Sequence, residues 1–155
     1  MAARVPSPHD RFMRMCIGLA RRARETGDTP VGSVVVRGDE IVGEGAEAVR
    51  ARGDVTAHAE IEALRAACAR MGSLDLSGCT LYTSVEPCVM CAYALRLARI
   101  SVVVTGARSA AAGPTSGGCA VLTDAGVLPS RPLPSLVSDV LGDECLAVLT
   151  ESRQR

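Results

Sequence analysis

The sequence has no tryptophan, one phenylalanine (Phe12) and two tyrosines (Tyr82 and Tyr93). Splayed or single-stranded nucleic acids are commonly held by stacking bases on aromatic side chains, so such platforms are scarce here. Net charge is also absent, because 17 basic residues balance 17 acidic ones. A balanced chain produces no global field that would attract a phosphate backbone or an anionic lipid surface. The composition therefore disfavours a function in binding nucleic acid or a membrane surface.

A long apolar run is missing from the start of the chain. Charged residues, most of them arginines, interrupt the first thirty residues, whereas a secretory signal peptide or a membrane span needs an unbroken apolar segment. The seven cysteines are an odd number, which argues against a disulfide framework. We therefore expect reduced thiols, a cytoplasmic location and no membrane association.

One domain covering residues 1–155 is expected, because a chain of this length suits a single hydrophobic core. Caps, turn residues and hydrophobic periodicity predict the elements along it. Helices are expected over 7–26, 56–70, 87–99 and 143–152, strands over 31–36, 40–43, 79–83 and 101–106, and loop with one short helix (119–125) over 107–135. This order predicts an α/β fold of three layers, α/β/α, with a mixed central sheet.

Four residues suited to metal and acid–base chemistry form two short groups. His58 and Glu60 lie two residues apart, and Cys88 and Cys91 form a C-x-x-C pair directly after Pro87. A proline at the first helical position would place both cysteines on one face of the first turn, where free N–H groups and the positive helix dipole favour thiolates. The pair is a common zinc half-site, although redox dithiols share its spacing.

The histidine can complete a metal site with three protein ligands, His58, Cys88 and Cys91. No second paired spacing of His or Cys supplies a fourth ligand, so the fourth tetrahedral position stays open for water, as in catalytic zinc sites. Glu60 can then move a proton between that water and a leaving nitrogen. The two groups, HAE and PCVMC, match the H-x-E…P-C-x-x-C signature of zinc deaminases, in which the glutamate is not a ligand.

With these motifs, the chain resembles the cytidine deaminase superfamily over most of its length. The segments PVGSVVV, DVTAHAEIEALRAAC, LYTSVEPCVMCAYAL and GDECLAVL are similar to the branch that contains tRNA adenosine deaminases and guanine deaminases. The resemblance implies a cytidine deaminase-like fold, one zinc ion (Zn²⁺) per chain and hydrolytic release of ammonia from a ring carbon. It also implies a homo-oligomer, with a dimer as the simplest form.

Substrate contacts follow from the same resemblance. Backbone groups at Ala57 and Ser84 are implied to hold the ring oxygen and the leaving amine. Glu47, in the segment GEGAEAVR, stands where the branch usually has an asparagine that grips the base. A carboxylate accepts hydrogen bonds, so we expect a substrate that presents N–H donors to Glu47. The alternative is that Glu47 is a solvated loop residue and that another group recognises the substrate.

The expected substrate is a small base, a nucleoside or a related aminated heterocycle. The segment after the last predicted strand, GARSAAAGPTSGGCAVLTDAGVLPS, has a single basic residue, Arg108, whereas RNA binding needs basic and polar groups that face sugar and phosphate. The wobble adenosine of tRNA is the alternative substrate. The arginine-rich face of the first helix and the terminal ESRQR favour it.

Two other classes of protein share parts of the pattern. A structural or binding module with zinc would need His58, Cys88 and Cys91 but would tolerate the loss of Glu60. A dithiol redox protein would use the two cysteines without the histidine. Stoichiometric zinc in the purified protein excludes the second class.

The remaining acid and thiols near these motifs have simpler expected roles. Glu86, just before the proline, is expected to satisfy N–H groups at a helix start and to stay outside the catalytic set. Cys119, in a glycine-rich segment, is the one spare thiol expected near a pocket. The other three cysteines considered occupy apolar rows and are expected to be small core residues: Cys68, Cys79 and Cys145.

Overall fold

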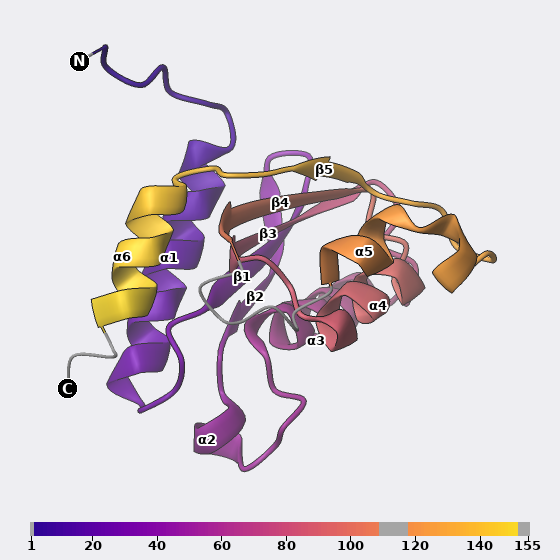
Figure 1. Ribbon diagram of the computed structural model, residues 1–155. Helices are drawn as coiled ribbons and strands as arrows, with labels where there is room; N and C mark the ends of the chain where they lie inside the picture. Colours follow the sequence, from indigo (N-terminus) through magenta and orange to yellow (C-terminus); the bar gives the residue numbers. More distant parts are fainter. Residues whose placement is uncertain (1, 109–117, 152–155) are drawn as a thin grey trace.

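A mixed five-stranded sheet in the order β2-β1-β3-β4-β5 forms the middle of the fold, seen in the computed structural model of residues 2–108 and 118–151 (Figure 1). β1 pairs antiparallel with β2 and β3, whereas β3, β4 and β5 run parallel. The strands are β1 (Gly32–Arg37), β2 (Glu40–Ala46), β3 (Cys79–Val85), β4 (Val102–Ala107) and β5 (Ser135–Val137).

Helices cover both faces of this sheet (Figure 1). α1 and α6 pack together on one face, while α3 and α4 cover the other face and α5 packs against α4. The helices are α1 (Asp10–Glu25), α2 (Val49–Arg52), α3 (Ala59–Met71), α4 (Val89–Leu97), α5 (Gly118–Thr123) and α6 (Gly142–Glu151), with a 3₁₀ turn, η2, at Ala125–Val127. The predicted three-layer α/β/α fold with a mixed sheet is confirmed.

Each face of the sheet has its own hydrophobic cluster, and this explains the run of valines in β1. Val34 and Val36 pack with α1 and α6, whereas Val35 packs with α3 and α4. Successive side chains of a strand point to opposite faces, so a strand covered on both sides is apolar throughout. The hairpin from β1 to β2 turns at Gly38, whose φ of +63° suits glycine.

α3 lies unusually close to β2 because two glycines of the strand have no side chain. A Cβ atom at Gly43 would stand 2.4 Å from the carbonyl oxygen of Ala63, and one at Gly45 would stand 2.1 Å from that of Ala59. Any side chain at these positions would push the helix away from the sheet. The two glycines therefore fix where the first turn of α3 begins.

Both helices that carry the predicted metal ligands begin later than the sequence pattern indicates. α3 begins at Ala59 and not near residue 56, and α4 begins at Val89 and not at Pro87. Cys88 is the N-cap of α4, with extended backbone angles, and its sulfur accepts a hydrogen bond from the backbone N–H of Cys91. The expectation that Pro87 is the first helical residue is therefore wrong, because the cysteine caps the helix.

The segment predicted as loop with one short helix over 107–135 contains a short helix, α5, close to the expected residues. It leads into β5, a strand that was not predicted. β5 has three residues at the edge of the sheet and none of them is buried, so it has no hydrophobic alternation to detect. The buried side chain of Arg96 anchors this region, because its guanidinium donates to four backbone carbonyls: those of Val121, Asp124, Leu128 and Arg131. The side chain of Cys119 lies outside the described residues, so the prediction about it stays open.

In the described part of the chain, every helix is too short or too polar to cross a membrane.

Candidate metal centre and active site

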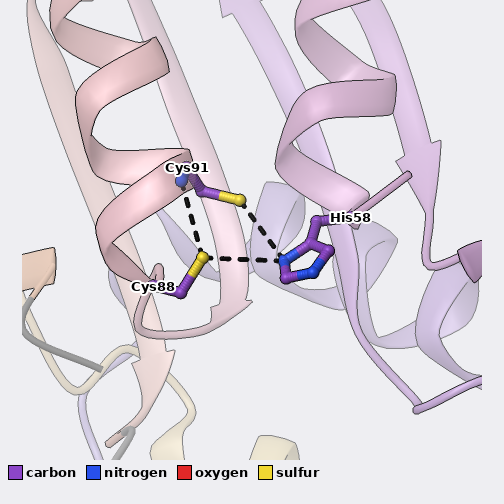
Figure 2. Close-up of side chains that lie close together, drawn as sticks. All are labelled: His58, Cys88 and Cys91. Carbon is purple, nitrogen blue, oxygen red and sulfur yellow. Dashed lines mark hydrogen bonds between the residues drawn. The ribbon is translucent and has the colours of Figure 1, made fainter. Parts of the chain in front are cut away.

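The N-termini of α3 and α4 bring the predicted ligands together (Figure 2). His58 is the residue that precedes α3, Cys88 precedes α4, and Cys91 lies in the first turn of α4. The Nδ1 atom of His58 lies 3.7 Å from the sulfur of Cys88 and 3.5 Å from the sulfur of Cys91. Figure 2 shows this nitrogen facing both sulfurs, while the other side of the ring points away from them.

These distances suit a zinc ion. With Zn–N of about 2.0 Å and Zn–S of about 2.3 Å, a tetrahedral angle separates a nitrogen from a sulfur ligand by about 3.5 Å. The three ligand atoms all lie within 4.8 Å of one another, and no further His, Cys, Asp or Glu joins them among residues 2–108 and 118–151. The donor set therefore fits a zinc site that keeps one position open.

Hydrogen bonds among the three side chains shift their pKa values. The pKa of Cys88 is lowered to about 4, because Cys91 and His58 hydrogen-bond its sulfur. The pKa of Cys91 is raised, because its hydrogen bond with Cys88 and its burial favour the thiol. The pKa of His58 is raised to about 9 by its hydrogen bond with Cys88. A divalent metal would displace the remaining protons, since metal ligands bind deprotonated.

Glu60 lies in the first turn of α3, two residues after His58, and is almost fully buried. Burial raises the pKa of its carboxyl group. One carboxylate oxygen, Oε1, accepts a hydrogen bond of 2.8 Å from the hydroxyl of Thr83 on β3. The structure thus places Glu60 in the same cavity as His58 and Cys88 and adds Thr83, which sequence reasoning missed.

One cavity of about 380 Å³ connects these groups, a size that suits a small-molecule ligand. Of the residues that the structure describes, four with carboxyl groups line it, together with one arginine, Arg50, and the ring of His58. Its lining residues are Asp28, Thr29, Val31, Glu47, Val49, Arg50, His58, Glu60, Val85, Glu86 and Cys88. A larger apolar cavity of about 610 Å³ lies by α3 and α4 and contains none of the metal ligands, so the smaller cavity is the candidate active site.

Glu47 follows β2 and lies in the cavity wall beside His58. Its side chain is buried, with Oε2 accepting a hydrogen bond of 3.0 Å from the backbone N–H of Ala59 and Oε1 lying 4.0 Å from Nε2 of His58. Burial raises the pKa of Glu47 to about 7. The alternative of a solvated loop glutamate does not describe this position.

Ala57 and Ser84, the other two expected substrate contacts, do not line the cavity. The N–H of Ala57 donates to Asp54 and its carbonyl accepts from Ala48. Ser84 lies within β3 and not in a loop, and its buried hydroxyl accepts from the backbone N–H of Gly32. Val85 and Glu86, the next residues of the chain, line the cavity in its place.

Arg50 is a second residue that sequence reasoning missed. It lies on α2 at the cavity, with its backbone N–H donating to the buried carboxylate of Asp28 at 2.6 Å. Its guanidinium makes no hydrogen bond or ion pair with any residue that the structure describes. Nothing in the spacing of VRAR distinguishes Arg50 from Arg52, which instead pairs with Glu62.

Comparison with known sequences agrees with this geometry. The zinc-binding region of cytidine and deoxycytidylate deaminases matches residues 6–107. The chain belongs to this deaminase family. The matched range extends to the end of β4 and includes His58, Glu60, Cys88 and Cys91. Membership of the cytidine deaminase superfamily is therefore confirmed.

Individual relatives carry different names. The tRNA-specific adenosine deaminase of Aquifex aeolicus (strain VF5) is 43% identical over 93 residues, which are 60% of this chain and 62% of that protein. The guanine deaminase of Bacillus subtilis (strain 168) is 41% identical over 96 residues, 61% of this chain and 62% of that protein. Each match thus spans less than two thirds of the relative's own length.

A solved structure from a study of A-to-I editing by tRNA:A34 deaminases at the wobble position of transfer RNA superposes with a TM-score of 0.77. It is 34% identical, and the superposition covers 90% of this chain and 99% of that one. The fold and the family are thus the same, while the relatives act on different kinds of substrate.

Proposed function

We propose that this protein is a zinc-dependent hydrolytic deaminase that releases ammonia from an aminated nucleobase, nucleoside or related small heterocycle. One observation carries the proposal: His58, Cys88 and the buried Glu60 line the same cavity, with Cys91 beside the other two ligands. A structural zinc site has no need of a buried carboxyl group next to an open position, whereas hydrolysis does.

The chain's own residues supply the proton transfers. Zinc held by His58, Cys88 and Cys91 would supply Lewis acidity, which makes water a nucleophile near neutral pH. Glu60 accepts a proton from the attacking water and delivers a proton to the amino nitrogen, so that a C–O bond forms, the C–N bond breaks and ammonia leaves. The burial of Glu60 keeps this proton from exchanging with bulk water.

Glu47 is proposed to recognise the substrate ring. One of its oxygens is held by the backbone of α3, which leaves the other toward the cavity that it lines. A carboxylate there accepts hydrogen bonds from ring N–H or amino groups. Backbone contacts at Ala57 and Ser84 stay predictions from the resemblance.

The acidic cavity favours a small ring that carries hydrogen-bond donors. Among the described residues, four carboxyl groups and one arginine line it, so the wall offers hydrogen-bond acceptors for N–H and amino groups and few cations for a polyanion. Purine-type and pyrimidine-type bases present N–H and amino groups without a negative charge. A free base or nucleoside is therefore the proposed substrate.

Adenosine at the wobble position of tRNA is the second candidate. The structural likeness to a tRNA:A34 deaminase extends over 90% of the chain, and Arg50 offers at the cavity a guanidinium that pairs with none of residues 2–108 and 118–151. Arginine recognises phosphate groups with paired N–H donors. A substrate with a phosphate next to the reacting nucleoside would use this residue.

Two further proposals concern the setting of the enzyme. We propose a cytoplasmic protein, since the sequence pattern favours reduced thiols. We also propose a homodimer, as the resemblance implies, with the exposed apolar residues of α4 as part of its interface.

Ammonia release from a panel of substrates tests the function. The panel contains guanine, cytosine, adenine, their nucleosides and an anticodon stem-loop with adenosine at position 34. Turnover of a base or nucleoside is the expected result, and turnover of the stem-loop alone would establish the second candidate. A zinc-loaded protein that releases ammonia from none of them would contradict the proposed function.

A further inference from the structure

We propose that Thr83 is a positioning residue that holds Glu60 in the orientation needed for proton transfer; this inference rests on the proposed function of Glu60. Thr83 lies on the central strand β3 with no exposed surface, directly beneath the first turn of α3. Its hydroxyl donates to Oε1 of Glu60 at 2.8 Å, and the carbonyl of Val85 lies 3.1 Å from the same hydroxyl. The strand thus grips one oxygen of the carboxylate.

The orientation matters because glutamate has three rotatable side-chain bonds. A carboxylate that transfers protons must stay within hydrogen-bond reach of both the attacking water and the leaving nitrogen. A bond to one oxygen removes alternative rotamers and leaves the second oxygen for the cavity that Glu60 lines. The bond thereby restricts where the carboxylate of Glu60 can lie in the cavity wall.

Two other buried hydroxyls lie beside that of Thr83 on the neighbouring strands, and they differ from it in their hydrogen bonding. Ser33 on β1 and Thr105 on β4 are the register partners of Thr83, so the three side chains share the face of the sheet that α3 and α4 cover. All three are buried. In the described part of the chain, the hydroxyls of Ser33 and Thr105 have no hydrogen-bond partner. The hydroxyl with a partner is the one that meets Glu60.

This row provides a matched control for the experiment. Thr83→Val removes a buried hydroxyl and keeps the size of the side chain, and Thr105→Val makes the same change at the adjacent register position. Thr83→Ser restores the hydroxyl and loses only a methyl group. A role in folding alone would lower the free energy of unfolding of Thr83→Val, which loses a bonded hydroxyl, and would leave the kcat of the folded enzyme unchanged.

The kinetics of the zinc-loaded variants are measured with whichever substrate of the panel wild type turns over fastest. Thr83→Val is expected to lower kcat by about 10- to 100-fold, because a displaced catalytic group loses about that factor. KM and zinc content should stay unchanged, Thr83→Ser should recover most of the loss, and Thr105→Val should match wild type. A Thr83→Val enzyme with wild-type kcat, or an equal loss in Thr105→Val, overturns the inference.

Crystal structures of the two valine variants decide the point independently of turnover. The inference expects the Glu60 carboxylate to move or become disordered in Thr83→Val and to stay in place in Thr105→Val. An unmoved carboxylate in both variants overturns it. Failure of the proposed function is recognised separately, because it shows as a lack of ammonia release in wild type.

Discussion

His58 and Cys88 both occupy N-cap positions, where side chains usually accept hydrogen bonds from free helix N–H groups. Cys88 still does so through its sulfur, whereas the ring of His58 makes no such bond and faces the two cysteines. Glu47 supplies the missing acceptor from outside α3, by bonding the N–H of Ala59. The histidine is thereby available for a metal at little cost to the helix.

Replacing Glu60 tests the role of the buried carboxyl group. Glu60→Gln keeps the shape of the side chain but removes proton transfer, so we expect kcat to fall by about 10²- to 10⁴-fold. Zinc content should stay at one ion per chain, since Glu60 is not a ligand. The control is Glu62→Gln, which changes a glutamate two residues further along α3 that pairs with Arg52 and Arg65. Ammonia release near the wild-type rate in Glu60→Gln would remove Glu60 from the mechanism.

Arg50 distinguishes the two substrate candidates. If phosphate contacts this guanidinium, Arg50→Gln lowers kcat/KM for the adenosine-34 stem-loop about tenfold, the size expected for one charged hydrogen bond. Turnover of free guanine should not change. Arg52→Gln alters the same short helix at a residue already paired with Glu62 and should leave both rates intact. Equal losses in the two variants would assign the effect to overall charge and not to Arg50.

The residues that carry a recognisable spacing could be predicted, and those that depend on strand register could not. His58, Glu60, Cys88 and Cys91 follow from two short motifs. Thr83 meets Glu60 only because β3 lies beneath α3 in one particular register. No local pattern in LYTSV encodes that contact.

At the scale of elements, close contact between β2 and α3 determines where the metal ligand and the acid lie. Gly43 and Gly45 let the backbone of α3 approach the strand directly. Because His58 and Glu60 lie at the start of α3, any shift of this helix moves both of them relative to the cysteines on α4.

Gly45→Ala tests this coupling. The added methyl group would stand 2.1 Å from the carbonyl oxygen of Ala59, so we expect the free energy of unfolding to drop by about 1–3 kcal/mol, as overpacking does. Zinc should also be lost to a chelator at lower chelator concentration. Denaturant unfolding and chelator titration measure the two effects.

Gly18→Ala is the control for that variant, because a Cβ at this exposed position of α1 has nothing within 4 Å. Alanine there should raise the free energy of unfolding by about 0.5–1 kcal/mol, since glycine is a poor helix former. A stable Gly45→Ala protein with unchanged zinc affinity would show that the close approach does not position the site.

Most elements follow from hydrophobic periodicity, but their ends and the later segments depend on tertiary contacts. α4 begins later than predicted because Cys88 acts as its cap. β5 was missed because it gains its hydrogen bonds from β4 without burying its side chains. The segment around α5 has little periodicity of its own and is tied down by Arg96 through backbone carbonyls.

For the molecule as a whole, the candidate site lies at the carboxyl end of the central strand β3, with Val85, Glu86 and Cys88 at the cavity. Sheets with parallel strands commonly bind ligands at this edge, where helix N-termini also meet. The PCVMC motif follows the end of β3 and begins α4. The same residues therefore predict both the site and the strand-to-helix order of the fold.

The proposed homodimer is a prediction at this scale. α4 exposes apolar side chains one turn apart, with Tyr93 38% and Leu97 48% accessible, and contiguous exposed apolar patches mark interaction sites. We expect a dimer by light scattering at micromolar concentration and a monomer for Leu97→Asp. Leu146→Asp, at a similarly exposed leucine of α6, should stay dimeric. A wild-type monomer would contradict the proposal.

The central claim is that His58, Cys88 and Cys91 hold one zinc ion with a position left open toward the cavity. Anomalous diffraction at the zinc absorption edge, from crystals grown without added metal, tests it most directly. The account predicts one strong peak about 2.0 Å from Nδ1 of His58 and about 2.3 Å from each sulfur, with no fourth protein ligand. A peak closed by a fourth side chain, or no peak between the two helices, would contradict it.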